Sequence, residues 1–326
     1  MQFFCRIINI IPDICLAKNV FNIILYTSGI IMDKEYTIYG FRFKVKNTLI
    51  TVAVACAILI VLLLIDRYLT PISWYGVIIG SAFMVALVLA TQTVTERGLP
   101  SDYPYDLIWW VFPICIVFAR AYYVLNALDE FHSFYDVIAI WNGGIAIYGG
   151  IIGGILAIFI CSKIKKHNFV DTLDCIAPVL ILAQSIGRWG NYVNQEVFGR
   201  EITNASWQWF PFAVHINNGT FNGWYMATFF YESVINLVGF FVLMTLLRKV
   251  KLRGIVCCGY LIFEGIIRYF LEGLRVPEYI LYIPGTKMPV SQAVSLGMIF
   301  IGTIWLLIIT IKRNKDNAKN NQTLSH

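Results

Sequence analysis

Long apolar runs are the feature that most restricts how this chain can fold. A helix needs about 20 mostly apolar residues to cross a hydrocarbon core roughly 30 Å thick. Only 13% of the 326 residues are charged, against about a quarter in soluble domains. The sequence therefore predicts an all-α integral membrane protein and excludes a soluble globular domain. Six runs are clear, and two contain polar residues; the clear runs are 49–65, 76–93, 107–125, 143–161, 229–247 and 290–311, and the weaker ones are 177–190 and 254–270.

Lysine and arginine gather in short clusters between these runs, and their placement predicts the orientation of the chain. If eight helices alternate, the clusters at 163–166, 248–253 and 312–319 lie on one side. The positive-inside rule makes that side cytoplasmic, so that 191–225 faces outward. The net charge of +6 is then a sign of topology, and no nucleic-acid partner is expected. The eight cysteines lie mostly in apolar stretches without a C-x-x-C pair, which predicts neither a disulfide framework nor a zinc site.

The first segment with evident chemistry, 185–196, starts in a weak apolar run and ends in the outward loop. An arginine inside a span costs about 2.5–3.5 kcal/mol on the insertion scale, so Arg188 should face a polar cavity or an anion. On a continuous helix, Arg188, Asn191 and Gln195 share one face. A guanidinium beside carboxamides suits a phosphodiester. The alternative is that Arg188 pairs with Glu196 or extends to the surface.

The second segment carries charges of alternating sign. Glu264, Arg268, Glu272 and Arg275 fall on one face of a helix over 254–275. In water such pairs contribute a few tenths of a kcal/mol. Inside a membrane they must face protein or water, which favours a functional role.

Paired glycines surround a single tyrosine in the third segment, 143–154. The spacings Gly149/Gly153 and Gly150/Gly154 indicate close helix packing. Tyr148, which lies between the pairs Gly143-Gly144 and Gly149-Gly150, is either a core residue or a catalytic phenol.

These segments together resemble the prolipoprotein diacylglyceryl transferases, integral membrane enzymes that begin bacterial lipoprotein maturation. The stretch 187–196, GRWGNYVNQE, resembles the family signature, and the resemblance covers about 69–312. Further matches follow in the family's order: Trp74-Tyr75-Gly76, Ala119-Arg120, Trp141-Asn142-Gly143-Gly144, Leu173-Asp174, Phe230-Tyr231-Glu232, and Arg268 with Glu272-Gly273-Leu274-Arg275.

The resemblance implies a bundle of seven transmembrane helices, to which 49–65 would add a probable extra helix at the N-terminal side. We accordingly expect four parts. These are a cytoplasmic N-terminal extension (1–48), the extra helix (49–65), the diacylglyceryl transferase membrane domain (69–312) and a disordered cytoplasmic tail (313–326). The first 31 residues are interrupted by charges, so no signal peptide is predicted.

The implied reaction moves the diacylglyceryl group of phosphatidylglycerol to the lipobox cysteine thiol of a preprolipoprotein. It forms a thioether, releases glycerol phosphate and uses no metal or cofactor. Its partners would be phosphatidylglycerol, lipobox signal peptides and membrane lipids, at the outer half of the bacterial cytoplasmic membrane. By resemblance, Arg268 is a second functional arginine, and the phosphatidylglycerol-binding set is Arg188, Asn191, Asn194, Glu196, Tyr75 and Glu272.

Three departures leave the catalytic base open. Tyr148 stands where many members carry histidine, Glu264 stands where they carry tyrosine, and Met226-Ala227 replaces a common His-Pro. None of the four histidines lies inside a predicted span. Our hypothesis is that Tyr148 positions the substrate by hydrogen bonding, while Glu264 or the field of the arginines supports thiol deprotonation.

Two other classes of protein share some of these features. A secondary transporter also has glycine-interrupted spans with charges at mid-depth, but it predicts an inverted repeat, which is not visible. A magnesium-dependent lipid phosphotransferase needs clustered aspartates, and Asp171 with Asp174 does not supply them.

Overall fold

The computed structural model describes residues 35–38, 41–44 and 73–324, and the chain divides into two units between Ile72 and Ser73. In the first unit, β1 (Glu35–Ile38) and β2 (Phe41–Lys44) pair as an antiparallel hairpin. The predicted extra helix at 49–65 lies outside the described residues, as does most of the N-terminal extension.

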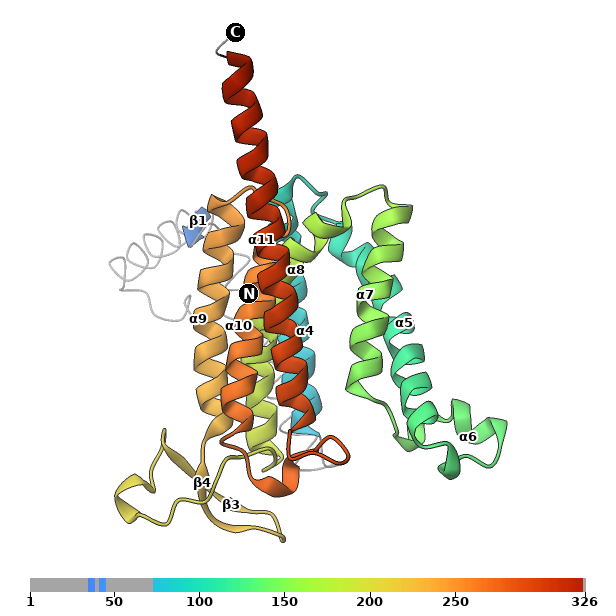
Figure 1. The fold of residues 1–326 in the computed structure, drawn as a ribbon. Coiled ribbons are helices and arrows are strands. Elements are labelled where there is room, and N and C mark those ends of the chain that lie inside the picture. Colours follow the sequence, from blue (N-terminus) through green and yellow to red (C-terminus); the bar gives the residue numbers. More distant parts are fainter. Residues whose placement is uncertain (1–34, 39–40, 45–72, 325–326) are drawn as a thin grey trace, which may run out of the picture. The chain divides into compact units, whose positions relative to one another are not determined.

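The second unit is built from long helices (Figure 1). Shorter elements are η1 (Val94–Arg97), η2 (Leu128–Glu130), α6 (Phe134–Ile138), η3 (Ile140–Asn142), η4 (Ala205–Trp207) and η5 (Pro277–Tyr279). The long helices are α4 (Trp74–Thr93), α5 (Tyr103–Asn126), α7 (Ile147–Ile164), α8 (Phe169–Val193), α9 (Thr228–Lys249), α10 (Ile255–Glu272) and α11 (Val290–Leu324).

Six helical segments of the described chain are long and apolar enough to cross a membrane. They confirm the prediction of a mainly helical, multi-pass membrane protein, and they include α8, which was a weak run in the sequence. The helix α10 is not among them because it carries Glu264, Arg268 and Glu272 within its 18 residues. It nevertheless packs against α8, α9 and α11. The six segments are Trp74–Arg97, Tyr103–Asn126, Ile147–Ile164, Phe169–Val193, Thr228–Lys249 and Val290–Asn317.

Glycines set the closest helix contacts. A Cβ atom on Gly149 would overlap the carbonyl oxygen of Phe118, and one on Gly153 would lie 2.8 Å from the Phe118 Cβ. This confirms that the paired glycines of α7 allow close packing, here against α5. On α9, a Cβ atom on Gly239 would lie 2.7 Å from Ile181 of α8 and would overlap the Phe263 ring of α10. The three helices α8, α9 and α10 are thereby held in direct contact.

The loop that leads into α7 is organised by Arg120. This buried arginine donates hydrogen bonds to four carbonyl oxygens, those of Asp136, Val137, Gly143 and Gly144, at 2.6 to 2.8 Å. Gly143 and Gly144 have φ of 88° and 75°, a backbone conformation that favours glycine. The motifs Ala119-Arg120 and Trp141–Gly144 thus lie together and fix where α7 begins.

The outward loop expected at 191–225 contains regular structure. Strands β3 (Ala213–Asn217) and β4 (Asn222–Met226) pair as an antiparallel hairpin between α8 and α9. A small apolar core that includes Phe198, Ile216 and Val276 holds the hairpin against the segment after α10. Trp207, Trp209 and Phe210 stay about half exposed, at 49%, 52% and 48%, as aromatic residues at a membrane interface would.

The prediction of a disordered tail from residue 313 is wrong as far as Leu324, because α11 continues to that residue. Neither glycine nor proline follows Gly302 to end the helix, and lysine is a good helix former. The last turns of α11 extend beyond the neighbouring helix ends (Figure 1).

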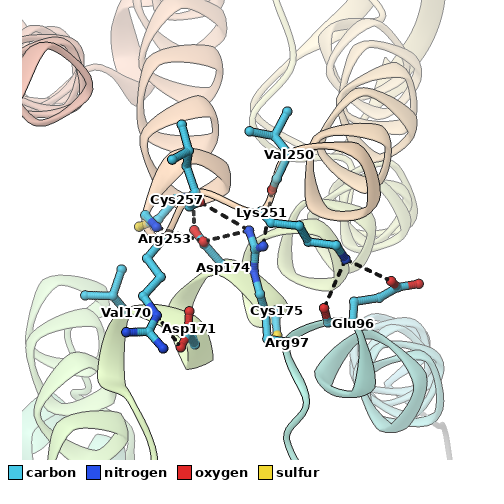
Figure 2. Close-up of polar contacts among 12 residues, drawn as sticks. Glu96, Arg97, Val170, Asp171, Asp174, Cys175, Val250, Lys251, Arg253 and Cys257 are labelled. Atoms are coloured by element: carbon cyan, nitrogen blue, oxygen red, sulfur yellow. Dashed lines mark hydrogen bonds and ion pairs between the residues drawn. The ribbon is translucent and has the colours of Figure 1, made fainter. Parts of the chain in front are cut away.

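At the end of the unit away from the β3–β4 hairpin, a buried ion pair joins three segments. Asp174 of α8 lies 3.1 Å from Arg97 and accepts hydrogen bonds from the backbone N–H groups of Gly254 and Cys257, at 2.8 and 2.9 Å. Arg97 also donates to the carbonyl of Val250 at 3.1 Å. Figure 2 shows the Asp174 carboxylate between Arg97 and the start of α10. This arrangement, which we call the Asp174 clamp, ties α10 to α8 and η1.

Candidate functional site

Four charged side chains from three helices meet inside the bundle, and we call them the arginine–carboxylate cluster. They are Arg188 of α8, Glu232 of α9, and Glu264 and Arg268 of α10. Arg188 Nη2 lies 2.7 Å from Glu232 Oε1. Arg268 Nε lies 3.4 Å from the same oxygen and 3.1 Å from Glu264 Oε1. Two guanidinium groups therefore converge on one carboxylate oxygen, and the formal charges of the cluster sum to zero.

The helix contacts around the cluster explain why Arg188 faces Glu232. Ser185 Oγ donates to the carbonyl oxygen of Ser233 at 2.7 Å, and Trp189 Nε1 donates to Ser233 Oγ at 3.1 Å. The rings of Trp189 and Phe229 pack edge to face, with centroids 5.4 Å apart. These contacts fix α8 against α9 on both sides of Arg188. Its side chain is 13% exposed and that of Glu232 is 6% exposed, so their attraction is only weakly screened.

The sequence left open whether Arg188 pairs with Glu196, and the structure shows that it does not. Glu196 Oε1 instead accepts hydrogen bonds from Asn191 Nδ2 at 3.3 Å and from Asn194 Nδ2 at 3.5 Å. The three predicted binding residues Asn191, Asn194 and Glu196 are thus brought together, at the end of α8 that leads to the hairpin.

The prediction that Gln195 shares a helix face with Arg188 and Asn191 is wrong. The helix α8 ends at Val193, and Gln195 has a φ of 50°, which turns the chain away from the helix axis. Gln195 Oε1 accepts a hydrogen bond from the backbone N–H of Asn217 at 2.8 Å. It therefore holds the β3–β4 hairpin and not the cluster.

The predicted ladder of four charges on α10 is two separate ion pairs. Arg268 pairs with Glu264, as expected, but Glu272 pairs with Arg275, at 3.1 Å. The helix ends at Glu272, so Arg275 lies beyond it, in a bridge to Gly199. The second carboxylate on Arg268 comes from Glu232 of a neighbouring helix.

The two tyrosines proposed for the site lie at different places. The Tyr75 ring packs on Gly190, where a Cβ atom would lie 2.8 Å from Tyr75 Cδ2, so Tyr75 is next to the end of α8 that carries Asn191. Tyr148 lies at the start of α7, with its ring centroid 6.4 Å from that of Tyr122. Within the described part of the chain, no ion pair or hydrogen bond connects Tyr148 to the arginine–carboxylate cluster.

Glu232 is the member of the cluster that sequence reasoning missed. It lies in the matched motif Phe230-Tyr231-Glu232, and the sequence pattern alone assigns it no role. The available signal was a carboxylate at the start of the apolar run 229–247, where a charge needs a partner. Its partner Arg188 is 44 residues away, and sequence spacing alone could not assign the pair.

The two guanidinium groups of this cluster are of the kind that proteins use to bind anions. Guanidinium groups bind carboxylate and phosphate oxygens through paired hydrogen bonds. Two of them lie within ion-pair distance of one oxygen, in a bundle of apolar helices, and such groups can bind a phosphate oxygen.

The family model described as prolipoprotein diacylglyceryl transferase matches residues 52–309. This match begins upstream of the predicted domain start at residue 69 and takes in most of 49–65.

Curated relatives match at similar levels. "Phosphatidylglycerol--prolipoprotein diacylglyceryl transferase 1" of Clostridium perfringens (strain 13 / Type A) is 39% identical over 250 residues, which cover 76% of this chain and 94% of the relative. The transferase of Listeria monocytogenes serotype 4a is 38% identical over 74% of this chain and 87% of its own length. That of Oceanobacillus iheyensis is 38% identical over 72% of this chain and 83% of its own length.

Proposed function

Because the chain belongs to the prolipoprotein diacylglyceryl transferase family, we propose that it transfers the diacylglyceryl group of phosphatidylglycerol to prolipoproteins. The observation that carries this proposal is the convergence of Arg188 and Arg268 on a single anionic oxygen. A lipid phosphodiester offers an oxygen of the same charge to the same donors.

The reaction has a clear electrostatic requirement. The lipobox cysteine attacks, as a thiolate, the glyceryl carbon that carries the phosphate. A sulfur–carbon bond forms while the carbon–oxygen bond breaks, and glycerol phosphate leaves with the electron pair. The phosphate goes from one negative charge as a diester to nearly two as a monoester. Cations placed beside it therefore stabilise the transition state more than the bound lipid.

In the proposed site, Arg188 and Arg268 bind the phosphate and stabilise this growing charge. Glu232 holds both arginines in place before the lipid arrives, and the phosphate then shares their donors with it. Glu264, 3.1 Å from Arg268, supports removal of the thiol proton. Asn191, Asn194, Glu196, Tyr75 and Glu272 are proposed to shape the headgroup end of the site.

The direct test is transfer by purified protein in phosphatidylglycerol vesicles with a lipobox peptide, in the presence of a metal chelator. We expect a thioether-linked diacylglyceryl peptide and one glycerol phosphate released for each peptide modified, measured by mass spectrometry. A peptide with serine in place of the lipobox cysteine is the matched control. Absence of the thioether product, with protein that is folded and correctly inserted, would contradict the proposal.

The proposed location is the bacterial cytoplasmic membrane, with the site toward its outer half. A reporter fused after His326 is expected to be cytoplasmic, and one inserted in the hairpin turn after Asn217 extracytoplasmic, because the basic clusters favour the inner side. Alkaline phosphatase and green fluorescent protein fusions measure this. The opposite pair of results would place the site in the inner half.

The roles of Tyr148 and Glu264 are tested by replacing one group at a time. Tyr148→Phe should reduce turnover yet leave it measurable, and Tyr148→His should stay active, because the phenol is proposed to position the substrate. Glu264→Gln should move the pH–rate profile to higher pH, because turnover without this proton acceptor depends on the thiol ionising by itself. Turnover from pH 6 to 9 is the measurement. Complete loss in Tyr148→Phe, with an unchanged profile in Glu264→Gln, would make the phenol the essential acid–base group.

A further inference from the structure

Buried polar atoms without partners lie within the arginine–carboxylate cluster, at Glu264, and one helical turn from it, at Gln184 and Asn236. Among the described residues, Gln184 Oε1, both amide atoms of Asn236, and Glu264 Oε2 accept or donate no hydrogen bond. The Asn236 side chain belongs to a residue that is 0% exposed, and Glu264 is 3% exposed. Proteins satisfy about nine in ten buried polar groups. We call Gln184, Asn236 and Glu264 the polar layer.

The register of the three helices places these side chains at one level. Asn236 follows Glu232 by one turn of α9 and is rotated by about 40° from it, so it shares the face that meets α8 and α10. On one side of it, Ser233 bonds to Ser185. On the other side, Gly239 contacts Ile181 and Phe263.

The helices α8 and α10 are joined at the same level. Gln184 Nε2 donates to Glu264 Oε1 at 3.4 Å and to the Tyr260 hydroxyl at 3.1 Å. Gln184 lies between Ile181 and Ser185 on α8, which are the residues level with Gly239 and Ser233. Asn236 therefore lies near the level at which Gln184 meets Glu264, on the face of α9 that meets α8 and α10.

Water fits this group of atoms better than other ligands do. A buried water typically makes about three hydrogen bonds, both donated and accepted, and the layer offers an amide N–H donor together with amide and carboxylate acceptors. A cation is disfavoured because Arg268 lies 3.1 Å from Glu264, and Arg188 lies one turn from Gln184.

We infer that the polar layer binds water, and that Asn236 and Gln184 position this water to carry the proton of the substrate thiol to Glu264. The inference rests on the proposed transferase function. The thiol loses a proton to become the attacking thiolate, and the proton passes through water to the Glu264 carboxylate, which becomes a neutral acid. The sulfur–carbon bond then forms as the leaving glycerol phosphate departs, and the acid returns its proton to the phosphate or to bulk water.

Glu264 faces charged and titratable groups on every side where the helices supply them. These are Arg268 and Tyr260 on its own helix, Arg188 on α8 and Glu232 on α9. On α11, the uncharged Ser295 and Ile299 pack on the neighbouring Gly265. Protonation of Glu264 changes the formal charge of the cluster from zero to plus one, in step with the charge that develops on the leaving phosphate.

The test uses the full-length protein in phosphatidylglycerol vesicles, with kcat and KM measured from pH 6 to 9. Asn236→Leu is expected to lower kcat roughly tenfold at pH 7, within the range of general-base effects. The deficit should close above about pH 8.5, where the thiol ionises without help, and KM for phosphatidylglycerol should not change. Asn236→Ser keeps a hydroxyl and leaves room for water, so it should stay within about twofold of the original rate.

Ser295→Ala is the matched control, because this buried hydroxyl bonds within its own helix to the carbonyl of Ser291, at 2.7 Å. It should leave the profile unchanged. If Asn236→Leu does not fold, Gln184→Met carries the same expectation. A loss of equal size at every pH, a raised KM, or an unchanged rate in the leucine variant would overturn the relay. An original protein without transfer activity would instead overturn the proposed function.

Discussion

Arg188→Ala is expected to lower the transfer rate by about 10² to 10³-fold, the loss seen when one donor to a developing oxyanion is removed. Arg188→Lys should recover little of this rate, because an ammonium group cannot bind two phosphate oxygens in the planar geometry of a guanidinium. The variant should still fold, since Glu232 keeps Arg268 as a partner at 3.4 Å. Initial rates with a lipobox peptide in phosphatidylglycerol vesicles measure the effect.

Lys165→Ala is the control for the loss of one positive charge. Lys165 pairs with Asp106 at 2.6 Å, and both side chains are about 40% exposed; Lys165 lies at the end of α7 opposite Tyr148. It should transfer at the original rate. A near-normal rate in Arg188→Lys would mean that a point charge suffices and that no paired phosphate contact is made.

Asp174→Ala is expected to lower the free energy of unfolding by about 3–5 kcal/mol, the usual cost of removing one partner of a buried ion pair. The substitution leaves Arg97, whose side chain is 4% exposed, without its carboxylate. It also leaves the N–H groups of Gly254 and Cys257 without an acceptor. Thermal unfolding of the detergent-purified protein at one fixed heating rate compares the variants.

Asp106→Ala removes an exposed ion pair of the same kind and serves as the control. Surface pairs contribute about 0–1 kcal/mol, so its melting midpoint should stay close to that of the original protein. Equal midpoints for the two variants would show that the Asp174 clamp adds no stability.

The membrane-spanning helices were predictable because apolar length is a local property. The runs at 76–93, 107–125 and 229–247 each lie within a helix, with ends shifted by only a few residues. The small-residue spacing of Gly149 and Gly153 likewise predicted a close helix contact. Charges inside weak runs also predicted a site at Arg188, Glu264 and Arg268, and the structure brings these three side chains together.

What the sequence could not supply was the pairing between distant segments. Glu232 reaches Arg188 and Arg268 only because the Ser185–Ser233 and Gly239 contacts bring α8, α9 and α10 together. The end of α8 at Val193 depends on the left-handed backbone of Gln195, and no local pattern in the sequence marked it. The pairing of β3 with β4 depends on a core shared with Val276, beyond α10, and this core too is non-local.

The Asp174 clamp and the arginine–carboxylate cluster are separated by the same number of residues on α8 and on α10. Asp174 and Arg188 are 14 residues apart on α8, and Gly254 and Arg268 are 14 residues apart around α10, a distance of about 21 Å on a helix. The hydrogen bonds Gly254–Asp174 and Gln184–Glu264 each join residues 80 positions apart. The two helices therefore run in the same direction and keep one register between these contacts. A single insertion or deletion between these contacts would rotate one end by about 100° and displace it by about 1.5 Å. Both contacts could then not form at once, and the two segments can change in side chains but not in length.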